Sequence, residues 1–396
     1  MNLQKGSKLR LIRLVIVFGV ISLLIHLTSC SEVAKPKDKT KPISEFSDST
    51  DIKPNILWIV AEDLSAYIPS FGDSTIVSPH LSQLAAEGVC YDNFYSPHPV
   101  CAPARAAIIT GMYANAIGAS HMRTGPWYGG KPSEQALDNY QKAMPEGLKP
   151  YEAVPPEEVK MFTEYLRQHG YYCSNNSKED YQFIKTPTAW DESSNKAHWR
   201  NRAPNQPFFA VFNLGLTHES QIWKKQKDSL WIPDDLAVPV PPYLPDSEIA
   251  KRDIRRMYSN IKEMDAEVGK ILQELKNDGL LENTIVLWYT DHGGPLPRQK
   301  RMLYDSGLKV PLIIRYPNST NRNKRDGSLL SFIDLAPTVL SLAEIQPPEH
   351  MQGKAFMGDF KYDGDSKYVF GAADRFDETT DRVRSVRDKR FKYQVL

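Results

Sequence analysis

The sequence of 396 residues has little of several features that mark particular protein classes. Its four cysteines are too few for a disulfide-based scaffold. Lysine and arginine total 49 against 48 acidic residues, so no basic excess favours nucleic-acid binding. No apolar run reaches the roughly 20 residues of a membrane-spanning helix, and we find no internal repeat. With 41% hydrophobic and 24% charged residues, the composition is typical of a globular protein rather than a disordered or fibrous one.

The first 30 residues predict a secretory signal peptide, because basic residues up to Arg13 precede a short apolar run at 14–27. The run closes in Leu27-Thr28-Ser29-Cys30, which resembles the bacterial lipobox, whose cysteine is lipidated and becomes the mature N-terminus. We therefore expect a lipoprotein of the bacterial cell envelope, in the periplasm or at the outer-membrane surface, held to the membrane through Cys30. An uncleaved anchor helix and an ordinary signal peptide are the alternatives. Residues 31–53 are polar and predict a tether.

From Pro54 onward, alternating strands and helices predict an α/β fold with a mixed, mostly parallel central sheet flanked by helices. The nearly continuous apolar run at 55–61 is typical of a strand buried on both faces of such a sheet. Further strands are predicted at 208–214, 284–290 and 310–316, and helices at 79–88, 246–276 and 333–345.

Polar pairs follow two of these strands directly. Glu62-Asp63 comes after the first strand, and Asp291-His292 comes after the strand at 284–290. Open α/β sheets bind ligands at the carboxyl ends of their strands, and carboxylate oxygens suit hard cations such as Ca²⁺ or Mg²⁺. Either pair alone would more often be a helix cap or a solvated loop. Together they predict a metal site.

The segment Cys101-Ala102-Pro103-Ala104-Arg105 resembles the Cys-x-Pro-x-Arg signature of the type I sulfatases, whose cysteine is oxidised after synthesis to formylglycine. Flanking motifs agree with it: Pro54-Asn55, Glu62-Asp63, Pro79-His80-Leu81, Thr110-Gly111, Asp291-His292-Gly293 and Tyr304-Asp305-Ser306-Gly307. The resemblance extends from Pro54 to the end of the chain. It implies the alkaline-phosphatase-like sulfatase fold, a bound Ca²⁺, a formylglycine-generating maturation enzyme as partner, and hydrolysis of a sulfate ester or sulfamate on a sulfated glycan.

The chemistry explains why a modified cysteine is needed. A formylglycine hydrate offers one hydroxyl for attack on sulfur, activated as metal-bound water is. Its second hydroxyl lets the sulfated intermediate expel sulfate by collapsing to the aldehyde, an exit that serine and unmodified cysteine lack. Cys101 also begins a predicted helix, where the N-terminal dipole favours an anion. Arg105 is predicted to point back at this nucleophile and stabilise it.

The resemblance implies four further catalytic residues. Lys178, in the segment 170–180, matches the sulfate-binding lysine, and His218 matches the histidine on the leaving-group side. Asp180 stands where many relatives have histidine, although a carboxylate can still accept a proton from the hydrate. Lys300 matches the second lysine. Two neighbours are alternatives for that role: Arg298 and Arg301.

Some positions depart from the family pattern. Glu62 replaces the first of the usual paired aspartates and His292 replaces a common asparagine, so the predicted ligands are Glu62, Asp63, Asp291 and His292. Three segments resemble the sulfamidase and heparan-sulfatase-like branch more than the arylsulfatases: 118–123, 172–178 and 197–200. Whether the bond is an O-sulfate or an N-sulfate stays open.

The domain organisation expected from these features is a signal peptide (1–30), a tether (31–53), a catalytic domain (54–346) and a partial C-terminal subdomain (347–396). In relatives this subdomain is a small antiparallel layer, and here only its first strands are predicted, at 368–373 and 385–396, so we expect it to be truncated. A charged loop between them supplies substrate-binding candidates together with Arg123: Asp374, Arg375, Asp377 and Glu378. An ordinary solvated loop is the alternative.

Two other functions compete with a sulfatase. A phosphodiesterase of the alkaline-phosphatase superfamily would use threonine or serine and two transition metals, which the pentapeptide at 101–105 argues against. A catalytically impaired, glycan-binding lipoprotein is favoured by Glu62, Asp180 and the shortened subdomain. The remaining thiols at Cys90 and Cys173 follow apolar segments and are predicted to be buried and unpaired.

Overall fold

The computed structural model describes residues 53–122, 134, 135, 138, 142, 152–317, 320–376 and 379–396. The predicted signal peptide with Cys30, the predicted tether before Lys53, and three further residues named above fall outside this part: Arg123, Asp377 and Glu378. Within the described residues, no helix combines the length and apolar character needed to cross a membrane.

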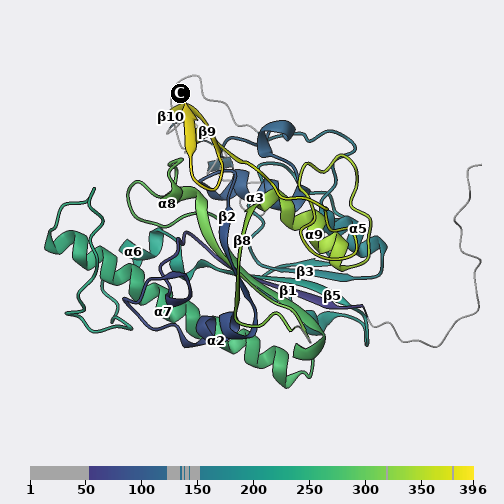
Figure 1. The fold of residues 1–396 in the computed structure, drawn as a ribbon, viewed down its shortest axis with the longest axis horizontal. Helices are drawn as coiled ribbons and strands as arrows, with labels where there is room; N and C mark the ends of the chain where they lie inside the picture. Colours follow the sequence, from purple (N-terminus) through teal and green to yellow (C-terminus); the bar gives the residue numbers. More distant parts are fainter. Residues whose placement is uncertain are drawn as a thin grey trace, which may run out of the picture. The chain divides into compact units, whose positions relative to one another are not determined.

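A mixed sheet forms the centre of the fold, in the order β4-β3-β5-β1-β6-β7-β2-β8 (Figure 1). The strands are β1 (Asn55–Ala61), β2 (Val89–Tyr95), β3 (Tyr172–Asn176), β4 (Glu192–Ser193), β5 (Phe208–Leu214), β6 (Thr284–Thr290), β7 (Lys309–Arg315) and β8 (Lys324–Ser331). β7 is antiparallel to both of its neighbours, and the other pairs are parallel. All the other strands of this sheet therefore end at the same edge.

Helices cover both faces of the sheet (Figure 1). α2 (Pro79–Glu87) and α7 (Glu248–Asn277) lie on one face; α3 (Cys101–Thr110), α5 (Phe162–Gln168) and α9 (Leu335–Leu342) lie on the other. Alternate side chains of β1 divide between the two cores: Trp58 packs in the α3 core and Ile59 in the α7 core. This two-sided burial explains the continuous apolar run in the sequence.

Most predicted elements are confirmed, and the α/β fold with them. β1, β5 and β6 have the predicted bounds, and β7 begins one residue early. The predicted helix at 333–345 is instead a 3-10 turn, η6 (Phe332–Asp334), followed by α9, which ends before Glu344 adopts a left-handed φ of 60°. β2, β3 and β8 were not predicted, because polar residues interrupt their apolar pattern.

Short elements complete the described chain: α6 (Ser220–Lys224), α8 (Asp305–Leu308), η1 (Pro69–Phe71), η2 (Ala114–Ile117), η3 (Trp199–Asn201), η4 (Gly215–Thr217) and η5 (Leu281–Asn283). Cys90 and Cys173 are buried free thiols, as predicted.

A second, antiparallel sheet contains β9 (Val369–Phe376), β10 (Thr379–Arg387) and β11 (Lys392–Val395), with β10 in the middle. The prediction that Asp374 and Arg375 lie in a charged loop is wrong. Both belong to β9, which continues to Phe376 because Arg375 and Phe376 still pair with β10. Asp374 accepts hydrogen bonds from Asn115 and Arg384 at 3.1 and 2.8 Å, so its side chain links β9 to η2 and to β10.

Candidate active site

Polar side chains from neighbouring strand ends converge at the carboxyl edge of the main sheet. β1 lies between β5 and β6, with Ala61 opposite Leu214 and Thr290. The residues that follow β1 and β6 therefore meet, and β5 contributes Asn213 beside them. α3 begins at Cys101, after the loop that follows β2. Topology thus brings four distant segments of the chain to one place.

Asp291 links the metal-site candidates to Arg105. Its Oδ1 accepts a hydrogen bond from the backbone N–H of Asp63 at 3.1 Å, and its Oδ2 accepts two from Arg105 at 3.2 and 3.1 Å. Arg105 also donates to Asn213 at 2.7 Å. Burial opposes ionisation of Asp291, but the charges of His292 and Arg105 outweigh it and lower its pKa to about 2. Arg105 therefore contacts Asp291 directly, whereas the sequence prediction aimed it at Cys101.

Cys101 occupies a site that favours negative charge. Its Sγ lies 3.2 Å from His292 Nε2 at the first residue of α3. Burial raises the pKa of a thiol, yet the positive charges of Lys178, Lys300 and His292 lower the pKa of Cys101 to about 5. The surroundings of this side chain can therefore stabilise an anion.

His292 joins Cys101 to Asp63. Its Nε2 lies 3.1 Å from Asp63 Oδ1, and its Nδ1 lies 3.0 Å from the carbonyl oxygen of Gly293. Burial disfavours the imidazolium, but Asp291, Cys101 and Asp63 outweigh it and raise the pKa of His292 to about 10. Burial likewise disfavours an ionised Asp63, but His292 and Lys300 hold its pKa well below the usual range.

Four side chains could share a cation. Ligand atoms of Asp63, Cys101, Asp291 and His292 all lie within 4.8 Å of one another. Asp63 Oδ1 is buried and lies 3.1 Å from His292 Nε2, inside this cluster. Two ionised carboxylates in one buried cluster fit a hard divalent cation. The structure does not bring Glu62 into this group.

Glu62 instead faces Lys178. Its Oε2 lies 2.9 Å from Lys178 Nζ, and its Oε1 lies 3.8 Å from Arg105 Nη2. Asp180 Oδ2 lies 3.4 Å from the same ammonium. Two carboxylates thus hold Lys178, whose charge lies close enough to lower the pKa of Cys101.

Lys300 is the basic residue of its loop that enters the site. Its Nζ lies 2.8 Å from Asp63 Oδ2 and 3.3 Å from His218 Nε2. Arg301 pairs with Glu219, and Arg298 lies over the ring of Tyr243. The structure therefore favours Lys300 over both arginines, and brings it to His218.

Sequence reasoning missed Asn213 and Glu219. Asn213 was visible as a polar residue within an otherwise apolar strand. Glu219 was visible only as an acidic neighbour of His218, and its contacts come from residues far along the chain.

Comparison with known proteins identifies the family. The sequence model described as Sulfatase matches residues 54–345. The chain belongs to the sulfatase family. A second model, described as N-sulphoglucosamine sulphohydrolase, C-terminal, matches residues 298–394. This agrees with the predicted sulfamidase-like branch.

Relatives of this sulfatase-family chain support the same grouping. An ulvan-active sulfatase of Formosa agariphila is 50% identical over 375 residues, which is 86% of this chain and 60% of that protein. The chain therefore spans less than two thirds of that relative's length. Human N-sulphoglucosamine sulphohydrolase is 30% identical over 176 residues, 41% of this chain and 35% of that protein. A solved structure described as a 2-O GAG sulfatase shares the fold, with a TM-score of 0.65, 19% identity and coverage of 86% of this chain and 82% of that one.

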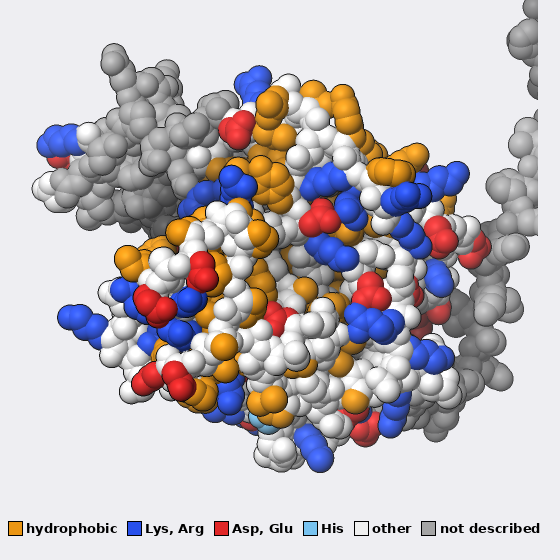
Figure 2. All heavy atoms as spheres, turned by 60° about the vertical axis from the view of Figure 1, so that its left-hand side comes forward, with side chains coloured by type: hydrophobic (Ala, Val, Ile, Leu, Met, Phe, Trp, Pro, Cys, Tyr) orange, Lys and Arg blue, Asp and Glu red, His pale blue; other side chains and the backbone are white. Residues whose placement is uncertain are grey.

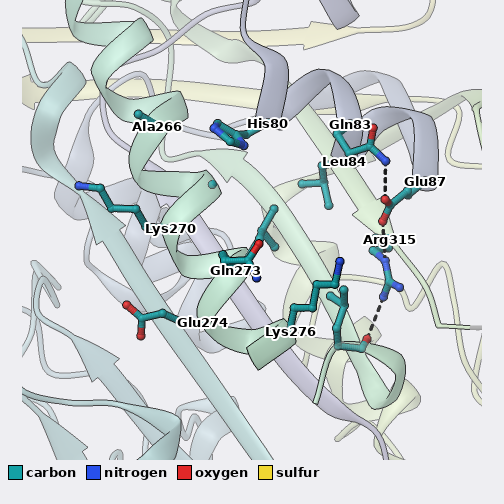
Figure 3. A pocket seen from close by; sticks show the side chains of 13 residues that line it. His80, Gln83, Leu84, Glu87, Ala266, Lys270, Gln273, Glu274, Lys276 and Arg315 are labelled. Atoms are coloured by element: carbon teal, nitrogen blue, oxygen red, sulfur yellow. Dashed lines mark hydrogen bonds and ion pairs between the residues drawn. The ribbon is translucent and has the colours of Figure 1, made fainter. Parts of the chain in front are cut away.

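A small cavity beside the cluster is lined by Arg105, Lys178 and Asn213, whereas a larger groove lies away from it. A groove of about 700 Å³ lies between α2 and α7, lined by residues that include Gln83, Lys270 and Arg315 (Figure 3). Arg315 ends the antiparallel β7, opposite Val286 near the start of β6, so the groove lies at the amino edge of the parallel strands. On the face shown in Figure 2, basic side chains are spread over the surface, with acidic and hydrophobic side chains between them.

Proposed function

We propose that this protein is a sulfohydrolase that removes sulfate from a glycan, with formylglycine made from Cys101 as nucleophile and Ca²⁺ as cofactor. The observation that carries the proposal is the setting of Cys101: it begins a helix, and the charges of Lys178, Lys300 and His292 surround it. Such a site suits both an ionised nucleophile and the oxygens of a sulfate group.

Asp63 and Asp291 would hold the cation, and His292 would join them as a neutral imidazole after losing its proton, because their ligand atoms cluster beside Cys101. When bound, Ca²⁺ would neutralise sulfate oxygens and favour ionisation of the formylglycine hydrate. Arg105 keeps Asp291 ionised and in place through two hydrogen bonds. Glu62 would act outside the cation site, by holding Lys178 in position through their ion pair.

The remaining residues divide between the two sides of the reacting sulfur. Lys178 would contact sulfate oxygens, and Asp180, next to it, would accept a proton from the hydrate. His218 and Lys300 lie together and would serve the leaving oxygen, which needs a proton as the ester bond breaks.

The 50% identical relative is described as ulvan-active, which makes ulvan oligosaccharides the first substrates to test. We further propose that the protein works at the bacterial cell envelope as a lipoprotein anchored through Cys30, after its maturation enzyme has modified Cys101. Labelling with a lipid precursor would test the anchor.

One experiment tests the chemistry. Protein made together with a formylglycine-generating enzyme should show Cys101 converted to formylglycine in the peptide 97–105 by mass spectrometry, and should release sulfate from sulfated oligosaccharides. Cys101→Ala should release none. Active protein that contains only the unmodified thiol would overturn the formylglycine mechanism, and hydrolysis of phosphodiesters alone would overturn the sulfohydrolase.

A further inference from the structure

Glu219 connects three loops that carry active-site residues. It directly follows His218, and its carboxylate accepts hydrogen bonds from Arg301 Nη1 and Nη2, both at 2.9 Å. The backbone N–H of Arg301 in turn donates to the carbonyl oxygen of Pro99, at 2.7 Å, in the loop that leads to Cys101. The bidentate pair thus joins the loops after β5 and after β6, and the backbone bond of Arg301 joins them to the loop before Cys101.

Glu219 also completes the surroundings of Lys300. An ammonium group has three N–H donors, and Lys300 Nζ has three partners: Asp63 Oδ2 at 2.8 Å, Glu219 Oε1 at 3.1 Å and His218 Nε2 at 3.3 Å. The Lys300 side chain is only 5% exposed, so bulk water cannot readily replace a lost partner. The direction of this ammonium therefore depends on Glu219.

The main chain of Glu219 strengthens the same arrangement. Its N–H donates to Asp63 Oδ2 at 2.7 Å, the oxygen that also faces Lys300. Glu219 consequently contacts both the carboxylate and the ammonium, and it holds His218 beside them through the chain. Since Arg301 balances its charge, Glu219 can face Lys300 without adding an unpaired negative charge to the site.

We propose that Glu219 is a positioning residue that aims the Lys300–His218 pair at the leaving oxygen of the substrate. This role rests on the proposed sulfohydrolase function. A leaving sugar alkoxide needs a proton far more than a leaving nitrophenolate does, because nitrophenol is the much stronger acid. Loss of Glu219 should therefore slow hydrolysis of a sugar sulfate more than hydrolysis of an aryl sulfate.

The test compares wild type with Glu219→Gln, which keeps the shape of the side chain and removes its charge. We expect kcat for a sulfated oligosaccharide to fall by at least about tenfold more than kcat for 4-nitrophenyl sulfate, with KM for both esters little changed. Glu219→Asp, which keeps the charge, should recover part of the sugar-sulfate rate. It also serves as the second variant if the glutamine variant does not fold.

Glu263→Gln is the matched control, because Glu263 is a partly buried carboxylate of α7 that lies outside the active site. It pairs with Lys225, which directly follows α6. It should leave the ratio of the two rates unchanged. Equal losses on both esters in Glu219→Gln, or no loss, would overturn the positioning role while the sulfohydrolase stands. Wild-type protein that hydrolyses neither ester would overturn the proposed function, and the positioning role with it.

Discussion

The carboxyl and amino edges of the central sheet differ in how deeply their charged side chains are buried. At the carboxyl edge, Asp63, Asp291 and His292 are fully buried, and His292 Nε2 lies 3.1 Å from Asp63 Oδ1 and 3.7 Å from Asp291 Oδ1. At the amino edge, the groove of about 700 Å³ is lined by charged side chains such as Lys270, which lies 70% exposed in an ion pair with Glu267 (Figure 3). The larger open volume is thus at the edge with ordinary surface chemistry. Buried, mutually dependent charges identify the functional edge better than cavity size does.

The largest effect is expected from Asp63→Asn, which removes ligand charge from the proposed cation site while keeping the shape of the side chain. Bound Ca²⁺ and turnover should both be lost, with kcat/KM falling by more than the ~100-fold that an outer partner of a metal site can account for. Metal analysis and sulfate release measure this. Asp265→Asn is the control, since Asp265 is also buried but accepts hydrogen bonds from the start of α2. Full activity after thorough chelation would contradict the prediction.

Arg105→Met should show how strongly the carboxyl edge depends on paired charge. It leaves Asp291 and Glu62 without the guanidinium that faces them, and removing one partner of a buried ion pair typically costs about 3–5 kcal/mol. Denaturant unfolding monitored by circular dichroism would detect the loss. At the amino edge, Lys270→Met should leave the free energy of unfolding unchanged within error. Similar free energies of unfolding for Arg105→Met and Lys270→Met would contradict the expected difference between the two edges.

Substitution of one glycine at each edge by alanine compares how tightly the two edges are packed. A methyl group at Gly293 would lie 2.0 Å from the carbonyl oxygen of Ser306, so Gly293→Ala must shift backbone next to His292. We expect a loss of about 1–3 kcal/mol and a reduced kcat. A methyl group at Gly269 would meet the ring of His80 at 2.5 Å, but His80 is exposed and can turn away, and alanine favours the helix. Gly269→Ala should be nearly neutral, and a severe loss of stability there would contradict this.

The smallest effect is expected from Gln273→Trp, which places a large side chain in the groove of Figure 3. Gln273 is exposed on α7, so the free energy of unfolding should change by no more than about 0.5 kcal/mol. The rate of sulfate release should equal that of wild type, because the groove and the catalytic cluster lie at opposite edges. A clear fall in kcat would show that the two edges are coupled.

Local sequence patterns were sufficient for the parts of the fold that are buried on both faces. β1, β5 and β6 lie in the interior of the sheet, so their residues form nearly continuous apolar runs. β8 lies at the edge of the sheet, and its first half is polar and mostly exposed, so no run marks it. β9 continues through Asp374 and Arg375 because β10 pairs with it, which no local pattern reports.

The sequence by itself determined that the polar residues after β1 and β6 meet at one edge of the sheet, because both strands are recognisable apolar runs and parallel strands end together. Tertiary structure alone decided the partners within that cluster: Glu62 reaches Lys178, Arg105 reaches Asp291, and Lys300 rather than its arginine neighbours reaches Asp63. The two residues of each pair lie about 115 to 240 positions apart in the sequence. These pairs form where folding brings the two side chains close together at the sheet edge. A buried charge is costly unless it is paired, so it pairs with the opposite charge that lies beside it in the folded protein.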